Sequence, residues 1–314
     1  MLRYGLKRGL LLIPTLLLVS FLAFSISRLV PGDIVELMIT EQSYADDVAA
    51  LRARLGLDKP LLTQYGVYLK GLFRRELGTS LWSGQPVMHE IARRFPVTLE
   101  LALLSLLFTY FIGIPIGVIA AVRQDSTFDY FLRSSSIGFL SIPGFWIATL
   151  VLVFGSVWFK WTPPLEYIPL RRDPLRNLAQ FVLPAFIMAQ ALSAGTMRMT
   201  RAMMLEVMRQ DYIRTARAKG LPTWKVVLRH ALRNASIPIV SIFGLQLAHL
   251  LGGAVIMERI FVLPGMGKFM LDAITWRDYP VIQGVNLFIG SLVILINLAV
   301  DLLYGFLDPR IRYR

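Results

Sequence analysis

Few side chains in this sequence could carry out acid–base or nucleophilic chemistry in an apolar setting. His249 lies inside a long apolar run and Asp301 near the end of another, and ionisable residues in such runs are typical of ion-coupled transport. Cysteine is absent, which excludes a thiol nucleophile, a thiolate metal site and a disulfide framework. The string at 265–269 comes nearest to a phosphate-binding loop but lacks its spacing and hydroxyl residue. We therefore expect neither ATP hydrolysis nor a metal site in this chain itself.

The strongest chemical pattern is a basic segment at 198–233. It contains nine Lys and Arg residues together with Glu206 and Asp211. Each charge costs about 2.5–3.5 kcal/mol near the centre of a bilayer, so burying the whole segment there would cost on the order of 30 kcal/mol. The segment must therefore lie in water or at a membrane surface.

Two short amphipathic helices are predicted within this segment. Gly220 is suited to end the first, because glycine readily adopts the left-handed conformation that closes a helix, and Pro222 is suited to begin the second. Apolar residues follow helical spacing in both halves. They are Leu205, Met208, Tyr212, Ile213 and Ala216 in the first half, and Trp224, Val227, Leu228, Ala231 and Leu232 in the second. The pattern predicts a helix–glycine–helix elbow.

The residues of the elbow leave two interpretations open. The basic faces could lie against anionic lipid, where each charge near the surface contributes on the order of 1 kcal/mol. Alternatively, two short helices joined by a specified turn could form a docking surface for another protein.

Long apolar runs must position this segment. The sequence is 55% hydrophobic and 17% charged. About 20 uncharged apolar residues are needed to cross a hydrocarbon core about 30 Å thick. Six runs meet that requirement without Lys, Arg, Asp or Glu, and they are 9–27, 101–122, 134–159, 177–197, 234–257 and 281–300. The predicted fold class is all-α, a polytopic membrane protein with six transmembrane helices.

The distribution of charge predicts the orientation of these spans. The net charge of +13 comes from residues in the connections between apolar runs, which membrane topology explains better than nucleic-acid binding does. Lys and Arg are nearly balanced between the two sides, but short connections weigh most in the positive-inside rule. We therefore expect both termini and 198–233 to be cytoplasmic, and the segment 31–96 to be external.

Local patterns add detail to this arrangement. Helical spacing within 31–96 predicts two short helices, one before Gly56 and one after Pro60, which we interpret as a packed external cap in preference to a direct substrate site. Proline removes a backbone donor and bends a membrane helix. Five of the runs contain one, namely Pro14, Pro115, Pro143, Pro184 and Pro238.

The elbow carries a resemblance to a known family. The stretch 214–220, RTARAKG, resembles the cytoplasmic EAA loop of ABC-importer permeases, in the Arg-Thr-Ala form typical of dipeptide, oligopeptide, glutathione and nickel systems. Segments along the whole chain resemble the same family in the same order. They are PGD at 31–33, LGLDKP at 55–60 with Gln64 and Tyr65, PGMG at 264–267, RDYP at 277–280 and DPRIRY at 308–313.

Some positions depart from the family pattern. Arg214 and Thr215 stand where the general EAA pattern has Glu and its first Ala, so a direct acidic contact with an ATPase is not implied. Ile34 replaces a usual Pro, and Glu76 replaces a usual Asp.

The resemblance implies the fold of a type I ABC-importer transmembrane domain over 1–314, with the external segment 31–96, core spans within 97–307 and a cytoplasmic coupling loop at 198–236. It implies ATPase coupling through Asp211, Arg214, Thr215, Ala216, Lys219 and Gly220. Pro264, Gly265 and Gly267 become candidates for an external gate. Among the polar residues of the runs, Gln190, Gln246 and Asn286 become candidates for the substrate path.

The implied function is that of a permease subunit in an ATP-driven, binding-protein-dependent importer, for peptides of the dipeptide, oligopeptide or glutathione class. Expected partners are a second homologous permease, two ATPase subunits, an extracytoplasmic substrate-binding protein and the lipid bilayer, with no nucleic acid. ATP and Mg would bind the ATPase subunits, and no cofactor would bind this chain. The expected location is the cytoplasmic membrane of a prokaryote. Nickel chelates or oligosaccharides stay open as substrates, as does an ion-coupled secondary transporter that uses His249 or Asp301.

Overall fold

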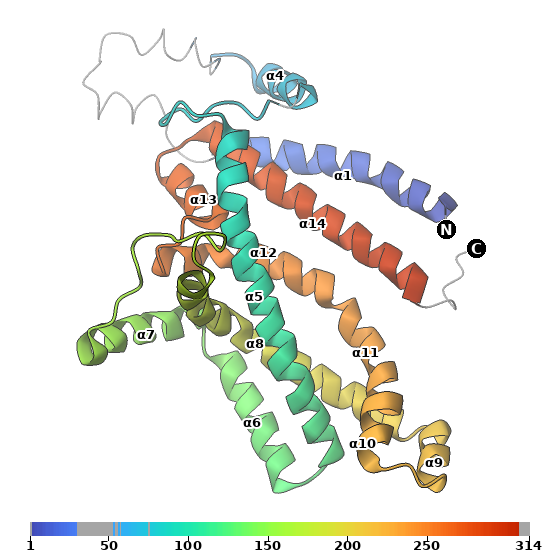
Figure 1. Ribbon diagram of the computed structural model, residues 1–314. Helices are drawn as coiled ribbons and strands as arrows, with labels where there is room; N and C mark the ends of the chain where they lie inside the picture. The colour runs from blue at the N-terminus through green and yellow to red at the C-terminus, as the bar shows by residue number, and fades with distance from the viewer. Residues whose placement is uncertain (1, 30–52, 54–55, 57, 75, 308–314) are drawn as a thin grey trace. The chain divides into compact units, whose positions relative to one another are not determined.

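The computed structural model describes residues 2–29, 53, 56, 58–74 and 76–307, and regular structure in these residues is helical (Figure 1). An isolated bridge pairs Thr79 with Pro86. The motifs at 31–33 and 308–313 lie outside the described residues, as does most of the first predicted helix of 31–96. The helices are α1 Leu2–Leu29, α4 Leu61–Phe73, α5 Val87–Val122, α6 Thr127–Ser141, α7 Gly144–Phe159, α8 Pro174–Met208, α9 Asp211–Ala218, α10 Thr223–Lys225, the π-helix η2 Val226–Ala231, α11 Leu232–Ser241, α12 Phe243–Ile260, α13 Met266–Thr275 and α14 Tyr279–Leu307. The all-α prediction is confirmed for the described residues.

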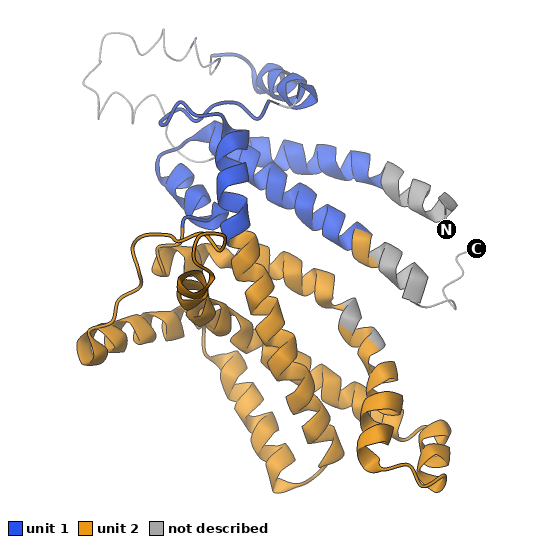
Figure 2. Cartoon of the chain, in the orientation of Figure 1, with its two compact units in different colours: residues 1–97, 264–298 blue, residues 98–263, 299–314 orange. Residues whose placement is uncertain are grey.

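The chain divides into two compact units (Figure 2). Unit 1 comprises residues 1–97 and 264–298, and unit 2 comprises residues 98–263 and 299–314. In unit 1 the start of α5 packs with α13 and the start of α14 around Val87, Ile91, Met266, Val281 and Val285. In unit 2, α8 contacts α6, α7, α11 and α12.

Among the described residues, three helices are long and apolar enough to cross a membrane singly. They are α5, α8 and the part of α14 from Tyr279 to Val300, and they contain the predicted runs 101–122, 177–197 and 281–300. The run 9–27 lies in α1, and the run 234–257 is shared by α11 and α12.

The run 134–159 does not form one continuous helix. It is divided between α6 and α7, which meet at an angle of 86° around Ile142 and Pro143. Proline has no N–H to donate to the carbonyl four residues earlier, here that of Phe139, so the helix cannot continue through this point. Pro143 therefore bends its run as predicted, and sharply enough to divide it.

Small residues allow α5 and α8 to pack closely within unit 2. A Cβ atom at Gly117 would lie 2.6 Å from the Met197 carbonyl oxygen, and one at Gly113 would lie 2.9 Å from that of Ser193. Glycines four residues apart on one face bring membrane helices together in this way. Any larger side chain at either position would push α8 away.

The helix α8 extends well beyond its apolar run. Asp173 begins it by accepting a hydrogen bond from the Arg176 N–H at 3.1 Å, and Pro174 occupies the first turn. Because the helix has 35 residues and the run ends at 197, its last three turns carry charged residues beyond the apolar stretch. These turns lead directly into α9.

Candidate functional site: the elbow and its supports

The predicted elbow is present at one end of unit 2 (Figure 1). The helix α9 ends at Ala218, and Gly220 has a φ of +74°, in the left-handed region. The Leu221 N–H donates to the Ala216 carbonyl at 3.4 Å, a bond typical of a glycine-terminated helix. No atom lies within 4 Å of the position that a Cβ would take at Gly220, so backbone strain is the main cost of a side chain there.

Apolar packing fixes the inner side of α9. Ile213 is fully buried and Ala216 nearly so, and both belong to a cluster with Met204 of α8, Val226 of η2 and Val118 of α5. The short helix is therefore attached to three other elements. A displacement of α9 would be transmitted to them through this cluster.

The outer side of α9 is charged and exposed. Asp211, Arg214, Arg217 and Lys219 are all exposed, and the Arg214 guanidinium lies 3.5 Å from the Asp211 carboxylate. Because both partners of this pair are mostly in solvent, it contributes little to stability. Of the predicted coupling residues, Ala216 alone faces the cluster, while the other five lie on exposed surface.

The second half of the elbow differs from the predicted helix. A π-helix spans Val226–Ala231, and the hydrogen bonds of a π-helix skip one residue more than those of an α-helix. In this π-helix and in α10 before it, the side chains that face inward differ from those predicted. Val226 is buried with Val227 and Ala231, whereas the predicted stripe residues Trp224 and Leu228 are 61% and 53% exposed. The predicted apolar stripe was therefore wrong at these two positions.

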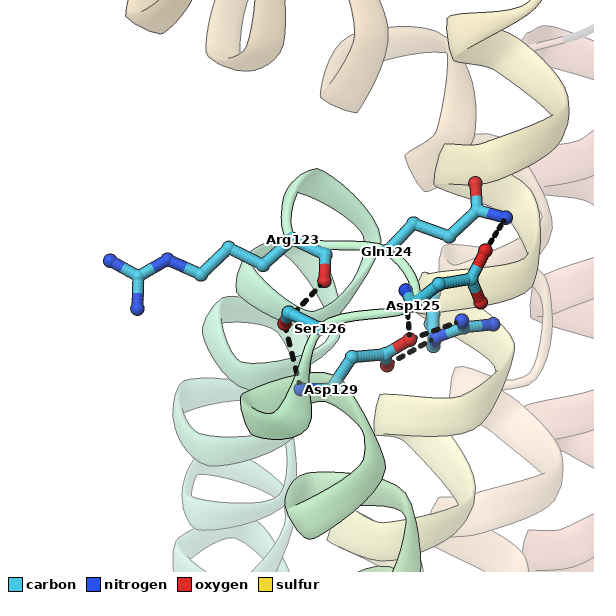
Figure 3. Close-up of polar contacts among 6 residues, drawn as sticks. Arg123, Gln124, Asp125, Ser126 and Asp129 are labelled. Carbon is cyan, nitrogen blue, oxygen red and sulfur yellow. Dashed lines mark hydrogen bonds and ion pairs between the residues drawn. The ribbon is translucent and has the colours of Figure 1, made fainter.

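A buried ion pair supports the end of α8 that leads to the elbow, and the sequence analysis missed it. Arg201 Nε donates to Asp129 Oδ1 at 2.7 Å, and Arg201 Nη2 donates to Asp129 Oδ2 at 2.6 Å. The Asp129 side chain has no solvent exposure and that of Arg201 has 16%. Asp129 also accepts from the Asp125 N–H at 3.1 Å, and its own N–H donates to Ser126 Oγ at 3.2 Å (Figure 3). One carboxylate thus ties the α5–α6 turn to α8.

The candidate gate residues Pro264, Gly265 and Gly267 lie at the start of α13 in unit 1. Gly265 precedes the helix, and Gly267 is buried in its first turn. The connection 258–280 contains the ten-residue helix α13, which the sequence did not predict.

Gln190 has a structural partner that the sequence did not reveal. Its side-chain Nε2 donates to the Phe139 carbonyl at 2.9 Å. Pro143 deprives this same carbonyl of its helical donor, so Gln190 of α8 satisfies the backbone at the α6–α7 bend. Gln190 also lines a cavity of about 210 Å³ that includes His249.

The other path candidates lie on separate elements. Gln246 of α12 is buried, and its Nε2 donates to Thr196 Oγ1 of α8 at 3.1 Å. Asn286 is half-buried in α14, in the part that belongs to unit 1. The structure gives Gln190 and Gln246 helix–helix contacts, and the side chain of Asp301 lies outside the described residues.

The chain matches the family described as binding-protein-dependent transport system inner membrane component over residues 113–313. Residues 1–102 match the model of the N-terminal part of such membrane components. The chain therefore belongs to this family of permeases.

Curated relatives resemble it along its whole length. A putative peptide transport system permease of Brucella abortus strain 2308 is 44% identical over 98% of each chain. The di/tripeptide transport system permease of Pseudomonas aeruginosa strain UCBPP-PA14 is 43% identical and the dipeptide transport system permease of Escherichia coli K12 is 40% identical, each over 100% of both chains.

A solved structure shares the fold. An inward-facing form of the MetNI methionine ABC transporter matches with a TM-score of 0.56 and 20% identity, over 70% of this chain and 97% of that one. A second crystal form of that transporter matches with a TM-score of 0.54. The fold is therefore that of an ABC-importer transmembrane domain.

Proposed function

We propose that this chain is a membrane-spanning subunit of an ATP-driven importer that receives peptides from an extracytoplasmic binding protein. The substrate class is supported by full-length similarity to permeases named for peptide, dipeptide and di/tripeptide transport. The observation that carries the mechanism is α9, a short helix with a buried apolar side and an exposed charged side.

The proposed membrane arrangement has six spans and both termini in the cytoplasm. The spans are α1, α5, the bent pair α6–α7, α8, the pair α11–α12, and α14. In this arrangement one permease domain covers 1–314 and the elbow lies on the cytoplasmic side. The rule that favours positive charge in short cytoplasmic connections supports that orientation.

The proposed partner of the elbow is an ATPase subunit, which holds the exposed side of α9. Asp211, Arg214, Thr215, Lys219 and Gly220 then form the docking surface, while Ala216 keeps the helix attached to the cluster beneath it. Closure of two ATPase subunits on ATP would push α9, and the packed cluster would pass that displacement to α5 and α8. Such coupling needs a rigid element whose position depends both on the ATPase subunits and on the membrane helices. The elbow is suited to this because α9 is short and packs against both α5 and α8.

The remaining parts of the proposed assembly lie on other chains. A second homologous permease completes the pathway, and ATP and Mg bind the two ATPase subunits. The gate candidates at the start of α13 would face the binding protein. The path candidates Gln190 and Gln246 would take part through their helix–helix contacts, and Asn286 would contribute a polar side chain from α14.

Substitutions at Gly220 test the proposed function. In Gly220→Val, a β-branched residue must adopt the left-handed conformation, at a cost of about 1–2 kcal/mol, so the elbow is expected to change shape. We expect the reconstituted importer to lose binding-protein-stimulated ATPase activity and uptake of a fluorescent dipeptide, with normal membrane insertion. Gly220→Asn is the matched control, because asparagine tolerates this conformation.

Two outcomes would contradict the proposal. Full stimulated ATPase activity and uptake in Gly220→Val would show that the elbow does not couple the subunits. Dipeptide uptake by the chain alone, driven by a proton gradient without ATPase subunits, would place the protein among ion-coupled transporters.

A further inference from the structure

The short helix α4 packs along the apolar helix α1 through a group of aromatic side chains. Tyr65 Oη lies 2.9 Å from Ser20 Oγ, and the Tyr65 ring lies 5.4 Å from those of Phe21 and Phe24. The rings of Tyr68 and Phe24 are stacked at 5.9 Å. These contacts fix which side of α4 faces α1.

The contacts lie well inside the apolar run of α1. Tyr65 Oη also donates to the Leu17 carbonyl at 3.4 Å. At 1.5 Å per residue, Phe24 lies about 5 Å and Leu17 about 15 Å before the end of the run at residue 27. In a helix that crosses a bilayer, these positions fall within the hydrocarbon of the leaflet near its C-terminal end. In the membrane arrangement proposed above, on which this step rests, α4 therefore contacts α1 below the membrane surface.

The neighbouring helix α14 does not cover α4. A Cβ at Gly290 of α14 would lie 2.7 Å from Val19 Cγ1, so α14 approaches α1 at Val19. At 100° per residue, Val19 points away from the direction shared by Leu17, Ser20 and Phe24. Within unit 1, α14 and α4 thus contact opposite sides of α1.

Beyond its contact with α1, α4 exposes apolar and basic residues. Val67 and Phe73 are 63% and 84% exposed on the side away from Tyr65 and Tyr68, and Lys70 and Arg74 are exposed on the same side. Leu62 is 81% exposed and lies one turn before Tyr65. The sequence of α4, LLTQYGVYLKGLF, contains no acidic residue, and Asp58 and Glu76 flank it. In water, α4 would expose these three large apolar groups without compensation.

We propose that α4 lies in the leaflet surrounding the C-terminal end of α1 and binds anionic phospholipid. Leu62, Val67 and Phe73 contact acyl chains, and Lys70 and Arg74 extend to the phosphate groups, as long basic side chains do at membrane surfaces. Two features favour lipid over a protein partner. One is the depth of the contacts on α1, and the other is the pairing of exposed apolar side chains with Lys70 and Arg74 on a helix that itself contains no acidic residue. This part of 31–96 is then a helix at the membrane interface and not a packed external cap.

The absence of cysteine allows a direct test with single labels. Val67→Cys and Phe73→Cys, each carrying a nitroxide, are compared with Gln124→Cys in the exposed α5–α6 turn, with the importer complex in nanodiscs of phosphatidylcholine and phosphatidylglycerol. Oxygen concentrates in the bilayer and a nickel chelate stays in water. We expect the ratio of oxygen to nickel collisions to be several-fold higher at residues 67 and 73 than at residue 124.

Two results would overturn the proposal, and neither depends on transport. Collision ratios at residues 67 and 73 equal to that at residue 124 would place α4 in water. Protection from both reagents would show that a protein partner covers it.

The headgroup preference is tested separately. Lys70→Gln with Arg74→Gln is expected to lower the phosphatidylglycerol that co-purifies with the complex relative to phosphatidylcholine, by about twofold or more. Arg171→Gln, at an exposed cation outside both α4 and the elbow, is the control and should leave that ratio unchanged. An unchanged ratio in the double variant would refute binding of anionic lipid by these two residues.

Discussion

Two buried aspartates, one in each unit, join a turn to its surroundings by different chemistry. Asp129 in unit 2 receives two hydrogen bonds from the Arg201 guanidinium, at 2.7 and 2.6 Å. Asp278 in unit 1 receives hydrogen bonds from Ser80 Oγ at 2.5 Å and from the Leu81 N–H at 3.3 Å. Asp129 is therefore neutralised by a full positive charge, whereas Asp278 is satisfied by neutral donors.

The difference determines how much stability each junction would lose if its carboxylate were removed. A buried charge pair tolerates the loss of one partner poorly, because the other charge stays buried without compensation. Neutral donors can rearrange or find other partners at lower cost. The charged junction lies on the last turns of α8, from which the elbow begins. The part of unit 2 that we propose to move is therefore joined to the α5–α6 turn by a charge pair.

The substitution Asp129→Asn should have the largest effect. It removes the charge that compensates Arg201, whose side chain is only 16% exposed, and should destabilise the chain by about 3–5 kcal/mol. The measurement is the free energy of unfolding of the purified chain in detergent, from a titration with sodium dodecyl sulfate followed by circular dichroism.

The interpretation of that loss is tested by removing both charges together. Asp129→Leu with Arg201→Met replaces the pair with apolar side chains of similar size, and such replacements are often neutral or stabilising. We expect the double variant to recover most of the lost stability. If it is no more stable than Asp129→Asn, the uncompensated guanidinium is not the cause of the loss.

The same chemical change at Asp278 should have a much smaller effect. Asp278→Asn keeps an acceptor oxygen, and the Ser80 hydroxyl can turn to accept from the new amide, so we expect a change of about 1 kcal/mol or less near neutral pH. The same titration measures it. A loss as large as that of Asp129→Asn would remove the distinction between a charge-paired junction and a neutral one.

Local signals explain what the sequence predicted correctly. Gly220 and Pro222 mark the turn of the elbow to within a few residues. Pro143 marks a bend because its ring leaves it without an N–H for the helical hydrogen bond. The remaining features depend on contacts between distant residues. Asp129 and Arg201 are 72 positions apart, and Gln190 meets a carbonyl 51 positions away.

The error in the second half of the elbow has a different origin. Val226–Ala231 can form either an α-helix or a π-helix from the same residues, and its packing against α9 accompanies the π form. The prediction assumed α-helical spacing throughout and so placed Leu228 of η2 and Trp224 of the preceding α10 on the buried side, where neither lies. The neutral junction at Asp278 could not be predicted from the sequence either, because Ser80 is 198 positions away and carries no charge that would indicate a partner.

The smallest predicted effect is a dependence on pH at the neutral junction. Burial raises the pKa of the Asp278 carboxyl, and hydrogen bonds from Ser80 and the Leu81 N–H offset part of that rise. A raised pKa means that the folded chain binds this proton more tightly than the unfolded chain. The stability that Asp278 contributes is therefore complete below its unfolded pKa of about 3.9 and falls as pH rises through the folded pKa.

Unfolding titrations of the wild type and Asp278→Asn between pH 4 and pH 7 measure this dependence. As pH rises, the free energy of unfolding of the wild type should fall relative to that of the variant. A shift in the opposite direction would mean that the hydrogen bonds outweigh burial, so that Asp278, like Asp129, is stabilised as a carboxylate.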